Sequence, residues 1–324
     1  MCTAISYKPL DHYFGRNLDW HFSYGERFVI TPRNFTLKFR HTEDINSHYA
    51  IFGTSVVEND YPLYFEGVNE VGLCIASLNF PENAKYFPVD KYKMNINSFE
   101  FIPWILCQFK SVNEVINALK NINICCDSFN DKYQTSPLHW IVSDSTSSIT
   151  VEPLNSGIKI FDNPYGVLTN NPTFDIHLSN INNYIGLSSE NHKGTFADKA
   201  LLKHYGSGMG AIGLPGDLSS ASRFVRAVFT KVNSISDNDE TSGVNQFFHI
   251  LDSVSQKKGC NKVGGDDYEY TIYSSCYNTS KNLYYYKTYE NNQISMIDIS
   301  RENIGGTELI SYPFIRSQNI YKQN

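Results

Sequence analysis

The sequence contains no long apolar run and no stretch of low complexity. Residues 1–13 lack the apolar core of a secretory signal peptide, and no apolar run approaches the roughly 20 residues of a membrane-spanning helix. We therefore expect a cytoplasmic protein that has no membrane partner. Hydrophobic residues make up 41% of the chain and charged residues 19%, a balance that excludes a disordered protein.

Basic charge is also scarce. The 27 Lys and Arg residues are outnumbered by 33 Asp and Glu residues, which gives a net charge of −6. Nucleic-acid binding usually requires a basic face, so we expect no nucleic-acid partner. The seven cysteines are irregularly spaced and form neither a C-x-x-C pair nor a cluster with histidine. We therefore expect neither a metal site nor a disulfide framework.

Two enzyme signatures are missing or incomplete. No G-x-S-x-G motif is present, which removes support for an ordinary serine hydrolase. Residues 208–213 match the glycine spacing of a dinucleotide-binding loop, but no strand precedes them and Pro215 breaks the chain after them. We interpret that stretch as a surface loop.

The most unusual feature that is present is a cysteine directly after the initiator methionine. Initiator Met is routinely removed before a small residue, and its removal would make Cys2 the first residue. A free thiol has a pKa of about 8.5 and an α-amino group one of about 7.7–8.0, so a nucleophile and a weak base would then share one residue. Position alone favours the plainer interpretation, a small cysteine buried near a chain end.

The predicted elements follow the order strands, helix pair, strands, helices, strands. No β-α-β alternation occurs, and this order is typical of antiparallel sheets with helices on the outside. We predict an α+β fold in which both ends of the chain join the same sheets, as one domain without a linker. Strands are expected at residues 3–7, 12–20, 28–31, 49–56, 61–65, 72–78, 138–142, 148–152, 157–161, 166–168, 270–277, 283–289 and 294–299, and a hairpin tip is expected at 67–70. Helices are expected at residues 99–108, 173–184, 222–232 and 244–254, and a further helix is expected to follow a capping box at 111–114.

The first two strands are expected to form a hairpin, which brings Arg16 and Asp19 back towards Cys2. A cation beside the thiol and a carboxylate beside the amine are what such a nucleophile needs. Residues three apart in a regular strand face opposite sides of the sheet. Either the strand end is irregular or one of the two side chains reaches around, and the sequence leaves both open.

Taken singly, several polar residues also have a purely structural interpretation. These interpretations are strand-end turns for Asn79 and Asn170, an ordinary ion pair for Arg16 with Asp19, and a solvated helix position for Arg223. His139, beside Trp140 in a predicted strand, is expected to be a buried core residue with satisfied hydrogen bonds rather than a ligand.

Seven short motifs occur in a fixed order along most of the chain. They are MCTA at 1–4, FGRNLD at 14–19, GVNE at 67–70 followed by GL at 72–73, LNFP at 78–81, GVLTN at 166–170, LPGD at 214–217 and ASRF at 221–224. Their content and order closely resemble the choloylglycine hydrolase family, which comprises the bile salt hydrolases and penicillin V acylases. Against this resemblance the plain interpretation of Cys2 fails.

The resemblance implies an N-terminal nucleophile hydrolase with a four-layer αββα sandwich of two antiparallel sheets, formed by residues 2–324 after removal of Met1. It also implies an amidase that needs no cofactor and is often a homotetramer. The implied roles are Cys2 as nucleophile with its α-amino group as base, Arg16 beside the sulfur, Asp19 as acceptor for the amine, Asn79 and Asn170 as oxyanion and positioning donors, and Arg223 as part of the electrostatic frame.

The resemblance also suggests the substrate. Bile salt hydrolases carry Asn at the strand-end position of Asn79, where penicillin V acylases tend to carry Tyr. We therefore predict cleavage of the amide that joins a bile acid to glycine or taurine, with conjugated bile acids as the small-molecule partners. The alternatives are a penicillin V acylase or other N-acyl amidase of the same family, and a non-catalytic β-rich binding protein. By motif position, Leu18, Tyr64 and Leu138 are expected to line the pocket.

Overall fold

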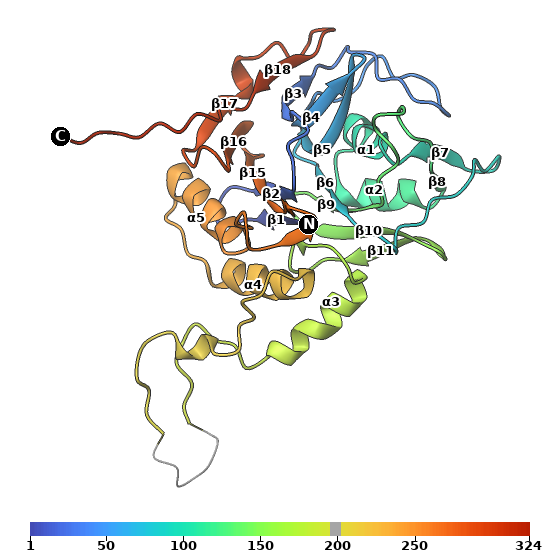
Figure 1. Ribbon diagram of the computed structural model, residues 1–324. Coiled ribbons are helices and arrows are strands. Elements are labelled where there is room, and N and C mark those ends of the chain that lie inside the picture. Colours follow the sequence, from blue (N-terminus) through green and yellow to red (C-terminus); the bar gives the residue numbers. More distant parts are fainter. Residues whose placement is uncertain (195–201) are drawn as a thin grey trace.

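The computed structural model describes residues 1–194 and 202–324. Strands from the two ends of the chain lie side by side at its centre, and the chain continues from them into two large antiparallel sheets (Figure 1). Within the described ranges, no helix combines the length and the apolar composition that crossing a membrane would require.

The first sheet contains the N-terminal strand as an inner member. Its neighbours are a two-residue strand from the middle of the chain and the second strand of the N-terminal hairpin. The strand order is β12 (Val167–Leu168), β1 (Cys2–Tyr7), β2 (Tyr13–Trp20), β15 (Tyr270–Asn278), β16 (Leu283–Thr288) and β17 (Ser295–Asp298). The predicted hairpin and the predicted pairing of the two chain ends are both confirmed.

The second sheet has eight strands and packs against the first. Phe28 and Tyr284, one from each sheet, stack with their ring centroids 4.4 Å apart, so aromatic side chains fill the space between the sheets. The strand order is β11 (Gly157–Asp162), β10 (Ser148–Leu154), β9 (Leu138–Ser143), β6 (Cys74–Asn79), β5 (Tyr61–Asn69), β4 (Ile51–Glu58), β3 (Arg27–Thr31) and β18 (Ile310–Pro313).

Helices cover the outer faces of both sheets, which completes the αββα order (Figure 1). α4 (Ser220–Asn233) and α5 (Glu240–Asp252) lie on the first sheet, and α1 (Phe101–Gln108) and α2 (Val112–Leu119) belong to the apolar layer on the second. The predicted N-cap of α2 is confirmed, because the Ser111 side chain accepts a hydrogen bond from the Glu114 amide, while the Glu114 carboxylate accepts from the Lys110 amide and not from that of Ser111. α3 (Phe174–Asn180) and a 3₁₀ turn (Ile181–Tyr184) precede α4.

The structure departs from the expected elements at a few places. β5 extends to Asn69, so residues 67–69 belong to the strand and the hairpin turn begins after them. The Asn69 side chain accepts hydrogen bonds from the amides of Val71 and Leu73 and thereby fixes the turn. Four further strands pair in small sheets: β7 (Met94–Asn97) runs parallel to β8 (Ile122–Cys125), and β13 (Lys262–Gly264) pairs with β14 (Asp267–Tyr268).

Candidate active site

The β1–β2 register decides which side chains can meet at the N-terminus. Cys2 lies opposite Leu18, and Ala4 lies opposite Arg16. Directly opposed residues of an antiparallel pair point to the same face, so the Cys2 thiol, Leu18 and Arg16 share one face. Asp19 points to the other. The question left open by the sequence is thus answered by ordinary strand alternation: the cation lies on the thiol face and the carboxylate on the opposite one.

Arg16 reaches into the second sheet from this shared face. Its guanidinium donates hydrogen bonds to the carbonyl oxygens of Phe65, at 3.1 Å, and Ser77, and it lies 3.9 Å from the carboxylate of Glu66. Burial alone would lower the pKa of Arg16, but the charges of Cys2, Tyr273 and Glu66, with hydrogen bonding to Cys2, outweigh burial and raise the pKa. Arg16 is therefore a permanently charged, fully buried cation beside the thiol.

Arg223 approaches Cys2 from the other side, out of α4. It is fully buried and donates to the Cys2 carbonyl oxygen at 2.6 Å, to the Thr3 hydroxyl at 2.7 Å and to Oδ1 of Asn170 at 2.8 Å. The same Oδ1 accepts a hydrogen bond from the Cys2 backbone nitrogen at 2.8 Å. Asn170 and Arg223 together hold both backbone groups of Cys2.

Asn170 also connects the first sheet to the second. Its backbone amide donates to the Ser220 hydroxyl at 2.8 Å, and its side-chain Nδ2 donates to the carbonyl oxygen of Asn79 at 2.7 Å. Asn79 is the last residue of β6, as expected from Pro81, and together with Met1 it lines a hollow of about 410 Å³. Two strand ends from different sheets therefore meet at Cys2.

Asp19 lies beside the start of the chain. Its Oδ1 accepts from the Thr271 hydroxyl at 2.6 Å, while its buried Oδ2 has no hydrogen-bond partner among the described residues. The Asp19 amide donates to the Met1 carbonyl oxygen at 3.0 Å. Burial raises the pKa of the Asp19 carboxyl, and the nearby α-amino group and Arg223 oppose that rise.

Met1 is present in the structure, so the nitrogen of Cys2 is a peptide amide. The Met1 ammonium donates to the Asp19 carbonyl oxygen at 3.0 Å and forms an ion pair with the buried carboxylate of Glu269. Burial lowers the pKa of this α-amino group. Elsewhere in residues 1–194 and 202–324, no three His, Cys, Asp or Glu side chains converge as a metal site would require.

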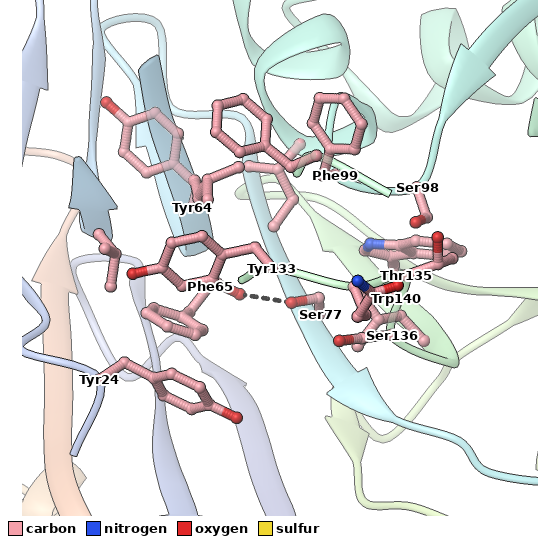
Figure 2. Close-up of a pocket in the computed structure, with 16 residues that line it drawn as sticks. Tyr24, Tyr64, Phe65, Ser77, Ser98, Phe99, Tyr133, Thr135, Ser136 and Trp140 are labelled. Carbon is pink, nitrogen blue, oxygen red and sulfur yellow. Dashed lines mark hydrogen bonds between the residues drawn. The ribbon is translucent and has the colours of Figure 1, made fainter. Parts of the chain in front are cut away.

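An apolar cavity of about 150 Å³ lies next to the segments that bind Arg16, and Figure 2 shows the side chains that line it. Its wall includes Phe65 and Ser77, whose carbonyls bind Arg16, and Tyr24, whose pKa is raised to about 12 by burial and by the charge of Cys2. The Ser77 hydroxyl donates to the Phe65 carbonyl at 3.0 Å (Figure 2). Seven aromatic residues contribute to the lining: Tyr24, Tyr64, Phe65, Phe99, Phe129, Tyr133 and Trp140.

The structure brings together all six residues that the resemblance assigned to chemistry. Of the three residues assigned to the pocket, two line the apolar cavity and one does not. Tyr64 and Leu138 line the apolar cavity. Leu18 does not; it is a buried core residue opposite Cys2. Sequence reasoning missed Tyr24 and Thr271. Thr271 borders a register shift between β15 and β2, and no local sequence pattern predicts this shift.

A cysteine directly after Met1, on an inner strand of a two-sheet sandwich and with buried arginines on both sides, is the arrangement of an N-terminal nucleophile hydrolase. Residues 2–312 match the choloylglycine hydrolase family of linear amide C–N hydrolases. The chain is 50% identical to the bile salt hydrolase/transferase of Lactiplantibacillus plantarum and 38% identical to that of Clostridium perfringens, over the full length of each. The chain belongs to the choloylglycine hydrolase family.

Solved structures agree with this assignment. The crystal structure of a C2A variant of the conjugated bile acid hydrolase from Clostridium perfringens superposes with a TM-score of 0.92, at 38% identity and over 100% of both chains. Penicillin V acylase from Agrobacterium tumefaciens, at 20% identity and a TM-score of 0.76 over 96% of this chain and 91% of its own, shares the fold. The predicted family and the predicted αββα sandwich are confirmed.

Proposed function

We propose that this protein hydrolyses the amide bond between a bile acid and glycine or taurine, with Cys2 as nucleophile after Met1 is removed. The observation that carries the proposal is the convergence of Arg16, Arg223 and Asn170 on Cys2 in a chain that is 50% identical, end to end, to a bile salt hydrolase/transferase.

In the first half of the reaction, the Cys2 sulfur attacks the amide carbonyl carbon. The thiol proton passes to the free α-amino group of the same residue, which then delivers it to the departing amine of glycine or taurine. Arg16 favours the thiolate, since a nearby cation stabilises it. Backbone and amide donors near Asn79 and Asn170 stabilise the tetrahedral oxyanion.

In the second half, water attacks the resulting thioester. The α-amino group takes a proton from this water, and the thiol of Cys2 leaves as the bile acid carboxylate is released. Oδ1 of Asn170 accepts from the Cys2 nitrogen, so it orients the amine in both halves. The apolar cavity lined by Tyr24, Tyr64 and Leu138 takes part of the steroid.

Turnover of three substrates tests the proposal. Purified protein is given a glycine-conjugated bile salt, a taurine-conjugated bile salt and penicillin V, and kcat/KM is measured for each. We expect both bile salts to be preferred. A preference for penicillin V would overturn the substrate assignment and leave the Cys2 chemistry intact, whereas no turnover of any amide would support the binding-protein alternative.

Asn79→Tyr is expected to lower kcat/KM for conjugated bile salts more than for penicillin V. A tyrosine ring would fill space that a steroid needs, and it would replace an amide donor and acceptor with a hydroxyl. Both substrates are assayed on both proteins, and circular dichroism confirms that the variant folds. Equal losses on the two substrates would leave Asn79 without a role in selectivity.

The acid limb of the pH–rate profile is expected to lie below the usual range of an α-amine. Burial, assisted by Arg223 and Arg16, lowers the pKa of the Met1 α-amino group although the charges of Cys2 and Asp19 oppose the change. After Met1 is removed, we expect burial to act in the same direction on the α-amino group of Cys2, which is itself a buried residue. Protonation blocks the base, so kcat/KM should fall as pH decreases, with a midpoint below about 7.7. A midpoint at or above 8 would contradict this placement of the base.

We also propose that residues 2–324 act as one domain, since β2 pairs with β15 and β3 pairs with β18 across almost the whole chain. By family resemblance, it works as a cytoplasmic homotetramer. Residues 185–194 and 202–215, between the 3₁₀ turn Ile181–Tyr184 and α4, extend away from the sheets (Figure 1). They expose Ile185, Tyr205 and Ile212, apolar side chains suited to contact with a neighbouring copy. Light scattering on the purified protein measures the assembly.

A further inference from the structure

Two buried histidines that the proposed chemistry does not use lie against the segment that carries Asn170. Nε2 of His139, in β9, is 2.9 Å from the carbonyl oxygen of Thr169, and Nε2 of His177, in α3, is 2.9 Å from the carbonyl oxygen of Asn170. A carbonyl oxygen can only accept, so each Nε2 carries the hydrogen. Two consecutive carbonyls around Asn170 are therefore each held by a histidine.

His139 also contacts the segment that carries Asn79. Its ring stacks on Phe80, the next residue along the chain, with centroids 4.1 Å apart and planes 5° from parallel. The carbonyl of Asn79 is the group that accepts from the Asn170 side chain at 2.7 Å. One imidazole thus touches both strand ends that meet at Cys2.

One buried glutamate lies beside both of the segments that carry the histidines. Oε1 of Glu152, in β10, lies 3.3 Å from Nδ1 of His139 and accepts the amide hydrogen of Phe174 at 3.0 Å. Phe174 is the first residue of α3, and His177 lies three residues further on, on the same side of the helix. Glu152 and His139 are fully buried and His177 is 1% exposed, so the network excludes water.

We infer that His139 and His177 are positioning residues that hold Asn170 in place for the reaction of Cys2. With Thr169 and Asn170 fixed at their carbonyls, Oδ1 of Asn170 stays 2.8 Å from the Cys2 nitrogen and Nδ2 stays on Asn79. The inference rests on the proposed function, because it gives Asn170 a part in the chemistry.

Loss of the hydrogen bonds from His139 and His177 should slow the chemical step and leave substrate binding unchanged. Neither histidine lines the apolar cavity or the hollow around Met1, so substrate contacts are not made by them. A displacement of about 1 Å in a positioning group can cost roughly 10²-fold in rate. Burial lowers the pKa of His177 to about 4, which keeps it a neutral donor in the neutral range.

The test replaces each histidine with leucine and, separately, with glutamine. Leucine removes the donor, whereas the glutamine amide can present an N–H close to the position of Nε2. On protein whose intact mass shows that it begins at Cys2, His139→Leu and His177→Leu are expected to lower kcat for a conjugated bile salt by about 10–100-fold, with KM within about twofold of wild type. The glutamine variants are expected to recover part of the loss.

A matched control and a second readout separate positioning from general damage. His48 is also buried and bonds to two carbonyl oxygens, those of Phe35 and Tyr49, but it contacts none of the site segments. His48→Leu should keep the wild-type kcat. Alkylation of Cys2 by iodoacetamide should proceed at the wild-type rate in the histidine variants, because Arg16 shares the thiol face with Cys2 and is held by the carbonyls of Phe65 and Ser77, not by either histidine.

Four results would overturn the inference: an unchanged kcat in both leucine variants, a rise in KM alone, glutamine variants no better than leucine, or an equal loss in His48→Leu. If His139→Leu does not fold, the comparison of His177→Leu with His177→Gln decides whether the inference holds. Asn170→Ala is measured in parallel. Full activity in Asn170→Ala would remove this part of the proposed site, whereas an inactive Asn170→Ala beside active histidine variants would reject the positioning role alone.

Discussion

Replacing Cys2 with alanine is expected to abolish amide hydrolysis while leaving the fold intact. The thiol is the group that forms the bond to the substrate, and no neighbouring side chain on its face of the sheet is a substitute. Losing a nucleophile of this kind costs about 10⁴–10⁶-fold in kcat. Cys2→Ser should be badly impaired as well, because a hydroxyl is much harder to ionise than a thiol. Turnover of a glycine-conjugated bile salt measures the loss.

The matched control for this substitution is Cys107→Ala. Cys107 is also a buried, unpaired thiol, but it lies in α1 on the outer side of the second sheet. It should keep wild-type activity, and circular dichroism should show native spectra for both variants. Substantial turnover by Cys2→Ala would end the nucleophile assignment.

Blocking the α-amino group is expected to be nearly as damaging as removing the thiol. A variant with an uncleaved residue ahead of Cys2 keeps the sulfur, Arg16 and the apolar cavity. Its Cys2 nitrogen remains a peptide amide, as in the structure with Met1 present, where it donates to Asn170. An amide cannot accept the thiol proton, so we expect a folded protein with a loss of about 10²–10⁴-fold, the usual size of a general-base contribution.

Intact mass and alkylation complete this experiment. Mass spectrometry establishes that the extra residue is retained, and peptide mapping locates the iodoacetamide label, because Cys126 and Cys260 are exposed and will react too. Cys2 should still be labelled. Wild-type turnover by the blocked protein would place the base elsewhere.

The parts of the fold that depend on neighbouring residues were predictable. The β1–β2 hairpin follows from a Pro- and Asp-containing turn between two apolar stretches, and the start of α2 follows from Ser111 and Glu114. The side of the sheet on which Arg16 lies also follows once the strand register is known. Successive side chains of a strand alternate between the two faces, and this alternation separates Arg16 from Asp19.

Contacts between distant segments were not predictable from the residues themselves. Arg223 is separated from Cys2 by 221 residues, and its bonds to Cys2 and Asn170 depend on how α4 packs on the first sheet. A helix pattern fixes its position on the helix and nothing about its partner. Only the family resemblance placed Arg223 at the site.

The parallel pair β7–β8 escaped prediction for a different reason. Each strand has only four residues, and both contain asparagine, which is depleted in strands: two asparagines in β7 and one in β8. The asparagines are used to satisfy the backbone: Asn95 donates to the carbonyl oxygens of Asp90 and Lys93, and Asn123 donates to that of Pro88. Their role becomes visible only when the loops that they hold are in place.

The pairing of β2 with β15 has a consequence for protein synthesis. β2 has no hydrogen-bonded partner along the edge that later pairs with β15 until residues 270–278 have left the ribosome. At about 5–20 residues per second, that point is reached on the order of 15–55 s after the N-terminus emerges. Throughout this interval the sheet beside Cys2 is unfinished. We therefore expect Met1, whose removal the proposed function requires, to be removed before the pairing of β2 with β15 completes that sheet.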